Sequence, residues 1–293
     1  MTGRGPPASR STDDRRTFGV INLDKPPGPS SHQVVSWVKD LLDIDRAGHA
    51  GTLDPKVTGC LPVLLGDATR LAQALVRGRK QYVAVLELHD DLPAGFEATL
   101  AAFEGELYQK PPRKSAVTRR LRTRTVYALE PLETSNRSVL LRIDCERGTY
   151  IRKLCHDIGL ALGTGAHMGE LRRTATTPFD DRDLVTLYDV ADAVAYADAG
   201  DPTALDGILH PAERAIQHLP TVTIAPSAAD AVADGAPVYA PGVIDAPAVD
   251  PADEPLVWCQ TPDGAAVCLG RVVGDPASST GEVVSLERVV IDP

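Results

Sequence analysis

Long apolar segments are missing from this chain of 293 residues, in which no run of about 18 uncharged apolar residues occurs. A membrane-spanning helix is therefore not expected. The first 16 residues, MTGRGPPASRSTDDRR, contain no apolar stretch of the kind found in secretion signals. The five cysteines are scattered without a Cys-x-x-Cys pair. This argues against a disulfide scaffold or a thiolate zinc site and is typical of a reducing cytoplasm.

Glycine-rich patterns of the P-loop and Rossmann types are also missing, so no nucleotide cofactor is expected. Neither an i, i+4 histidine pair nor a Cys/His cluster accompanies His49, His156 or His167, so no metal site is expected either. Apolar residues still make up 43% of the chain. That is enough to build the cores of one large domain and one small one.

Lysine is scarce, with 7 Lys beside 23 Arg, and the net charge is -10. Residues 1–173 contain 26 Lys or Arg against 20 Asp or Glu, whereas residues 174–293 contain 4 against 20. The basic balance of the first part favours a nucleic-acid-binding face. The acid excess of the second part indicates a solvated surface, as in proteins of salt-loaded cytoplasms.

The pattern of apolar residues predicts an α+β fold, because strands and helices mix without regular βαβ alternation. Periodicity predicts helices near residues 31–42, 67–77, 96–103, 150–162 and 186–197, and strands near 18–23, 82–88, 125–132 and 138–145. From residue 220 onward, short Val-rich strands with one brief helix predict a small all-β module of about 75 residues. Residues 1–16, rich in Gly, Pro, Ser and charge, predict a disordered tail.

The glycine-punctuated loop RAGHAGTLDPKVTG is the first candidate site. Its glycines permit unusual backbone angles, and Pro55 favours an extended conformation at Asp54. Asp followed by Pro is also a good helix start, in which Asp54 would serve only as the cap. The residues alone leave both interpretations open.

Two further stretches are rich in basic side chains. Between residues 110 and 124 the chain has seven basic residues and no acid, namely Lys110, Arg113, Lys114, Arg119, Arg120, Arg122 and Arg124. They form a plausible phosphate track, and a solvated loop is the alternative. In CERGTYIRKLCHDIG, a glycine turn places Tyr150 and Arg152 at the start of a helix, where they can reach a pocket. An Arg there can keep a carboxylate ionised, or it can simply be exposed.

Several of these strings together resemble one known family. They are, in order, GVINLDKPPGPSSH, GHAGTLDPKVTG, RKQYV, CERGTYIRKLCHDIG and GAHMGELRR. Their order is similar to that of the motifs of the TruB/dyskerin family of RNA pseudouridine synthases. The stretch KSAVTRRLRTRTVYALE resembles the archaeal/dyskerin branch, whose members are guided by H/ACA RNA. The segment IAPSAADAVADGAPVYAPGV resembles the start of a PUA domain, an RNA-binding module.

The resemblance implies a pseudouridine synthase fold, with a mixed and mostly antiparallel sheet flanked by helices. It implies a catalytic domain over residues 17–217 and a small β-barrel-like PUA domain over 218–293. It also implies an RNA substrate, an H/ACA guide RNA and small accessory proteins as partners, with no cofactor and a cytoplasmic location. A stand-alone synthase acting on the transfer-RNA T-loop and a non-catalytic RNA scaffold are the alternative hypotheses.

The resemblance further implies roles for single residues. Asp54 would be the catalytic aspartate, Tyr82 the ring that stacks on uracil, and Arg152 the partner of Asp54. The chemistry requires that this carboxylate stay ionised in a dry pocket, so Asp54 is expected to be buried. The remaining candidates are pocket residues and one further RNA contact, namely His49, Tyr150 and Leu171 in the pocket and Arg172 on the RNA. Lys25 and Pro26 would pack behind the catalytic loop.

Overall fold

The computed structural model describes residues 4–111 and 120–291, and within them the strands form two sheets. The large sheet has ten strands in the order β10-β1-β3-β8-β4-β7-β6-β5, with β2 paired to β3 and β9 to β8. Its strands are β1 (Phe18–Lys25), β2 (Ala47–His49), β3 (Thr58–Gly66), β4 (Lys80–Leu88), β5 (Gly105–Gln109), β6 (Arg122–Thr134), β7 (Ser138–Cys145), β8 (Ala166–Thr176), β9 (Phe179–Asp180) and β10 (His210–Pro211). All of its pairings are antiparallel except that between β3 and β8.

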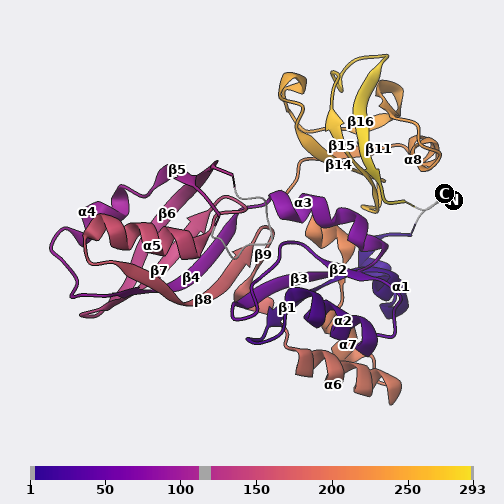
Figure 1. Cartoon of the computed structure of the whole chain (residues 1–293). Coiled ribbons are helices and arrows are strands. Elements are labelled where there is room, and N and C mark those ends of the chain that lie inside the picture. Colours follow the sequence, from indigo (N-terminus) through magenta and orange to yellow (C-terminus); the bar gives the residue numbers. More distant parts are fainter. Residues whose placement is uncertain (1–3, 112–119, 292–293) are drawn as a thin grey trace.

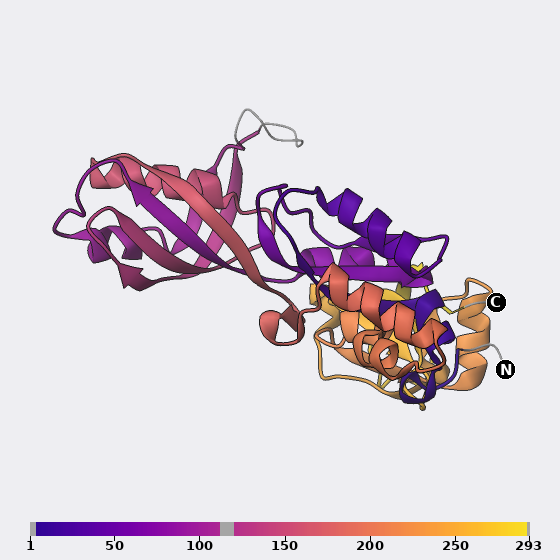
Figure 2. The same cartoon turned by 90° about the horizontal axis from the view of Figure 1, so that it is seen from below.

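Helices cover this sheet at both ends of the molecule (Figure 1). Helices α4 and α5 lie on the half that contains β4 to β8, whereas α2, α6 and α7 lie against the half that contains β1 to β3 (Figures 1 and 2). The α-helices are α1 (Thr12–Thr17), α2 (Ser31–Leu41), α3 (Ala72–Arg77), α4 (Phe96–Ala101), α5 (Ile151–Leu162), α6 (Leu187–Asp198), α7 (Thr203–Ile208) and α8 (Pro226–Ala233).

Helix boundaries follow local signals in the sequence. Ser30 caps α2 by accepting a hydrogen bond from the backbone N–H of Gln33. Thr186 and Asp189 form a reciprocal capping box at the start of α6. Helix α5 ends at Gly163, whose left-handed backbone (φ 76°) favours glycine. The positions of these three helices were predictable from the sequence for this reason.

The second sheet is formed by residues beyond 220 and has six strands in the order β12-β16-β15-β14-β11-β13. The strands are β11 (Thr221–Ile224), β12 (Val238–Tyr239), β13 (Val243–Asp245), β14 (Leu256–Gln260), β15 (Ala266–Val272) and β16 (Glu282–Val289). Together the two sheets confirm the expected α+β class with a mostly antiparallel main sheet and a barrel-like C-terminal sheet.

One hydrophobic cluster joins the two sheets. It contains Phe18 and Leu64 from the large sheet together with Trp258, Ala266 and Leu269 from the small one, all buried. Burial of a large apolar side chain contributes about 1.5–3 kcal/mol. The C-terminal sheet is therefore packed onto the main body through a shared core.

The N-terminal segment differs from its expectation of disorder over residues 1–16. In its described part, α1 begins with a capping box at Ser11, and the Arg10 side chain is only 2% exposed. Arg10 binds Glu213 through two hydrogen bonds of 2.8 Å each. Composition suggested disorder because the segment has few apolar residues, but a buried ion pair can order such a segment.

In the described chain, no helix is long and apolar enough to cross a membrane.

Candidate active site

Asp54 lies in the loop between β2 and β3, in a turn rather than at the start of a helix. The backbone N–H of Val57 donates to the carbonyl of Asp54 at 2.9 Å, and β3 begins at the next residue. The helix-cap interpretation of the Asp-Pro pair is therefore wrong. The carboxylate of Asp54 instead forms an ion pair with Arg152, 98 positions further along the chain.

Buried side chains hold the backbone on both sides of Asp54. The ammonium group of Lys25, fully buried, donates to the carbonyls of Pro26, Pro55 and Val57 at 2.9–3.0 Å. The hydroxyl of Ser31 accepts from the N–H of Leu53 at 2.9 Å and lies 3.1 Å from its carbonyl. Burial lowers the pKa of Lys25, and the negative charge of Asp54 opposes that change.

Arg173 fixes the loop from the other side and is the largest fully buried side chain. Its guanidinium donates to the carbonyl of Cys60 at 2.8 Å and to that of Gly51 at 3.2 Å. Gly59 has a φ of 97°, and a Cβ there would lie 2.2 Å from the carbonyl oxygen of Arg173. Only glycine therefore lets β8 come this close to the start of β3, next to the loop that carries Asp54.

Arg152 reaches Asp54 from the first turn of α5, whose N-cap is Tyr150. The Asp54 side chain is 59% exposed and that of Arg152 is 47% exposed. The expectation that Asp54 is buried is therefore wrong, because the pair lies at the mouth of an open cleft. An exposed ion pair contributes at most about 1 kcal/mol to folding, so its main effect is to orient and hold the carboxylate.

The cleft has a volume of about 1060 Å³ and brings Asp54 and Arg152 together with parts of β4, β7 and β8. Its walls include Val83, Val85 and Leu140, and along β8 it is lined by residues 168–172. Two register shifts interrupt the pairing of β4 with β8, one on each side of Leu171 to Arg173. Such bulges re-aim side chains and often occur next to active sites.

Tyr82 and Leu171 lie between the two elements that carry the ion pair. Both pack against the cluster that contains Leu53 and against the cluster that contains Ile151. Burial raises the pKa of Tyr82, while the positive charge of Arg173 and a hydrogen bond from it act in the opposite direction. Leu171 also lines the cleft.

His49 and Tyr150 are held by neighbours near the site. The His49 ring stands edge-on to His32, with 4.9 Å between ring centroids, and its Nδ1 is buried without a hydrogen-bond partner in the described chain. Burial, together with the charges of His32 and Arg173, lowers the pKa of His49 to about 4. His49 is therefore neutral at neutral pH. The Tyr150 N–H donates to Gln109 at 2.9 Å.

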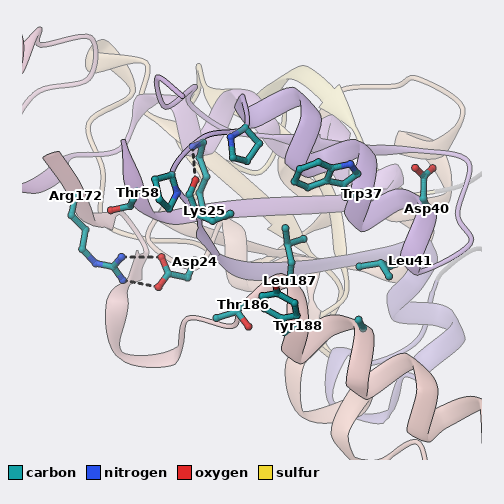
Figure 3. Close-up of a pocket in the computed structure, with 14 residues that line it drawn as sticks. Asp24, Lys25, Trp37, Asp40, Leu41, Thr58, Arg172, Thr186, Leu187 and Tyr188 are labelled. Atoms are coloured by element: carbon teal, nitrogen blue, oxygen red, sulfur yellow. Dashed lines mark hydrogen bonds and ion pairs between the residues drawn. The ribbon is translucent and has the colours of Figure 1, made fainter. Parts of the chain in front are cut away.

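Arg172 lies at the boundary between the cleft and a neighbouring groove. Its guanidinium forms two hydrogen bonds of 2.8–2.9 Å with the carboxylate of Asp24, and this pairing raises the pKa of Arg172 (Figure 3). Beyond this pair runs an apolar groove of about 790 Å³, whose sides include Trp37, Leu187 and Tyr188 (Figure 3). The carboxylate of Asp24 thus already binds both terminal nitrogens of the Arg172 guanidinium, a side chain that was expected to contact RNA.

The basic stretch is divided by the structure. Arg113, Lys114 and Arg119 lie outside the described residues. Lys110 and Arg120 are exposed, and Arg122 and Arg124 lie on β6. Arg124 has an acidic neighbour, with 3.6 Å between its Nη1 and Glu146 Oε1. The positive charges are therefore not all uncompensated, because the fold supplies an acid that is distant in the sequence.

Sequence reasoning did not assign Ser31 or Arg173 to the site. In the sequence, Ser31 lies at the start of an expected helix and Arg173 at the end of the motif GAHMGELRR. The sequence around Arg173 gives no sign of the backbone carbonyls of Cys60 and Gly51 that it binds, because they lie more than 100 positions away. Among the described residues, no group of three or more His, Cys, Asp and Glu side chains is placed to hold a metal ion.

Three protein families match parts of the chain. Residues 39–95 match the N-terminal domain of TruB family pseudouridylate synthases. Residues 152–217 match the C-terminal domain of tRNA pseudouridylate synthase B, and residues 3–35 match the DKCLD domain. The two TruB matches contain Asp54, Arg152 and Leu171.

Similar proteins extend over nearly the whole chain. A probable tRNA pseudouridine synthase B of Halobacterium salinarum is 64% identical over 98% of this chain and 99% of its own length. One from Pyrococcus abyssi is 47% identical over 97% of this chain and 87% of its own length.

Two solved structures match in fold as well as in sequence. Cbf5 in a Cbf5-Nop10-Gar1 complex has a TM-score of 0.92 at 45% identity, covering 98% of this chain and 89% of the other. A chain of an H/ACA RNP bound to a substrate RNA containing 2'-deoxyuridine has a TM-score of 0.90 at 43% identity, covering 99% and 90%. With these sequence and structural matches over almost its full length, the chain belongs to the TruB family of pseudouridine synthases.

Proposed function

We propose that this enzyme converts uridines in RNA to pseudouridine as the catalytic subunit of an H/ACA guide ribonucleoprotein. The observation that carries the proposal is the Asp54–Arg152 ion pair in a cleft of the TruB scaffold. The similar structures with Nop10, Gar1 and substrate RNA support the assignment of guide RNA and small accessory proteins as partners.

The reaction breaks the bond between ribose C1' and uracil N1 and forms one between C1' and uracil C5. The C5 proton is lost and N1 gains a proton, so atoms and oxidation state balance without a cofactor. Asp54 supplies the carboxylate that attacks the nucleoside or takes a ribose proton while the glycosidic bond breaks. Arg152 orients that carboxylate through their ion pair. The bound nucleoside completes the cover over the pair, which by itself is open to solvent.

Recognition of the uridine requires that the base leave its stack, at a cost of a few kcal/mol. Stacking on the ring of Tyr82 recovers about 1–3 kcal/mol of this. Leu171 forms an apolar wall beside it, and His49 and Tyr150 flank the pocket. Arg173 is a positioning residue, because it binds the backbone of Gly51 and Cys60 on either side of Asp54 and its charge acts on Tyr82.

The wider RNA contact involves both parts of the chain. The exposed Lys110 and Arg120 and the neighbouring basic residues contact phosphates without reading sequence, which is left to the guide. We assign residues 17–217 to the catalytic domain and 218–293 to a PUA domain that holds RNA. The five buried free cysteines are consistent with a reducing, cytoplasmic location.

A tritium-release assay with 5-tritiated uridine tests this function. We expect release from a guide-complementary substrate only when the H/ACA guide RNA and the accessory proteins are added. Release from transfer RNA without a guide would support instead a stand-alone T-loop synthase, as the names of the similar archaeal proteins suggest. Absence of release from either substrate would contradict the proposal.

A further inference from the structure

A second cluster of titratable side chains lies where β4 ends and β8 begins, outside the candidate active site. His89 follows β4, and its Nε2 lies 3.0 Å from Nδ1 of His167, the second residue of β8. The other ring nitrogen of His167 lies 3.0 Å from a carboxylate oxygen of Glu87, its direct cross-strand neighbour. The fold thus joins three side chains in the order Glu87, His167, His89.

The carboxylate orients the middle ring. Glu87 can only accept a hydrogen bond, so Nε2 of His167 carries the proton that is donated to it. Nδ1 of a neutral His167 then presents its lone pair toward His89. A carboxylate behind a histidine in this way is the usual arrangement that orients a histidine ligand toward a metal ion.

Two glycines leave the room that this arrangement needs. A Cβ at Gly165 would lie 2.9 Å from Nδ1 of His89, and one at Gly169 would lie 2.3 Å from the near carboxylate oxygen of Glu87. Any larger residue at either position would displace the side chain that it meets. The backbone N–H of His89 also donates to the carbonyl of Gly165 at 3.1 Å, which fixes the end of β4 against the turn before β8.

We propose that His89 and His167 chelate a divalent transition-metal ion of the zinc class, with Glu87 as the residue that orients His167. Two nitrogens that lie 2.0–2.1 Å from one ion, at angles between 90° and the tetrahedral angle, are about 2.9–3.4 Å apart. The observed separation of 3.0 Å falls in that range. On binding the ion, neutral His89 carries its proton on Nδ1 in place of Nε2, and each ring turns by about 45° so that both lone pairs point toward the ion. Imidazole suits zinc, copper and nickel.

Water completes the coordination, since the protein supplies only two ligands. The cluster is open to solvent, with the His167 side chain 57% exposed and that of Glu87 47% exposed, so an ion can enter. His167 directly precedes Met168, which lines the catalytic cleft. A bound ion therefore ties together the ends of the strands that carry Tyr82 and Leu171.

Calorimetric titration of the chelator-treated full chain with zinc chloride tests this site, using an untagged protein. We expect one zinc ion bound per chain by the wild type, and at least tenfold weaker binding by His89→Gln and by His167→Gln. Glu87→Gln should weaken binding by about ten- to a hundredfold, because an orienting partner is lost. His156→Gln is the matched control, since it removes an exposed histidine that contacts only the adjacent Asp157, and it should bind zinc as the wild type does.

Imidazole proton and nitrogen resonances measured by NMR add a readout that does not depend on heat or on catalysis. Zinc should shift the resonances of the His89 and His167 rings and leave that of His156 in place. Unchanged far-UV circular dichroism of the variants shows that the loss does not arise from unfolding. Wild-type zinc affinity in His89→Gln and His167→Gln, or no binding by the wild type at millimolar zinc, would overturn the proposal.

Discussion

Replacing Glu213 with glutamine should destabilise the fold far more than a change of one atom suggests. Glu213 lies in the 3₁₀ helix Ala212–Ala215 and accepts two hydrogen bonds of 2.8 Å from Arg10. It also accepts one of 3.0 Å from the backbone N–H of Ala266 in the C-terminal sheet. One carboxylate thus joins the N-terminal segment, the main body and the C-terminal sheet.

The expected magnitude follows from burial. The two side chains are 2% and 8% exposed, so the pair is shielded from water. Removing one partner of a buried ion pair leaves an uncompensated charge and costs about 3–5 kcal/mol. A domain has only about 5–15 kcal/mol of stability in total, so Glu213→Gln should remove a large fraction of it. Glu130→Gln is the matched control, because its pair with Arg142 is 52% and 46% exposed and should cost less than about 1 kcal/mol.

Urea unfolding at constant salt measures both variants. Trp258 is buried in the core that joins the two sheets, so its fluorescence reports on the junction that Glu213 holds. A loss for Glu213→Gln below about 1 kcal/mol, or equal to that of Glu130→Gln, would refute the reasoning.

Three further outcomes are expected. Ser31→Ala should lower kcat on the order of tenfold with KM little changed, because the backbone of Leu53, next to Asp54, loses its hydrogen bonds to the Ser31 hydroxyl. A wild-type kcat in single-turnover assays would contradict this. Burial lowers the pKa of Lys80 to about 7 from 10.5, so between these pH values the unfolded chain holds a proton that the folded chain lacks. Unfolding free energy should therefore rise with pH in this window, by up to about 1.4 kcal/mol per unit, and Lys80→Met should flatten the rise in urea titrations. Replacing Arg119, Arg120 and Arg122 with Gln should reduce the slope of log affinity for RNA against log salt by up to about 3, and an unchanged slope would place them off the RNA.

Local signals in the sequence were sufficient for most helices, whereas the roles of the candidate site residues came from the family resemblance. The capping box at Thr186 and the left-handed Gly163 mark helix ends by themselves. Strand β8 was not predicted, because the two bulges that flank residues 171–173 break its alternation of polar and apolar residues. The same bulges present Leu171 and Arg172 at the cleft.

Contacts between distant residues could not be read from the sequence. Arg172 was expected on RNA, but Asp24 lies 148 positions away and binds it in a fork. The spacing of histidines in the sequence predicts no metal ligand at His167, whereas the fold brings His89 to it across 78 positions. Burial of Asp54 was inferred from the needs of the chemistry, and the ion pair is open in the protein alone. In each case the missing information is tertiary.

The most direct test of the account compares Asp54→Asn with the wild type in the guided tritium-release assay, together with RNA binding measured on the same samples. The substitution removes one negative charge and leaves the size of the side chain unchanged. Tritium release should fall to background while affinity for the guide and substrate RNA stays within about twofold of the wild type. Release at the wild-type rate by Asp54→Asn would contradict the claim that this carboxylate carries the reaction.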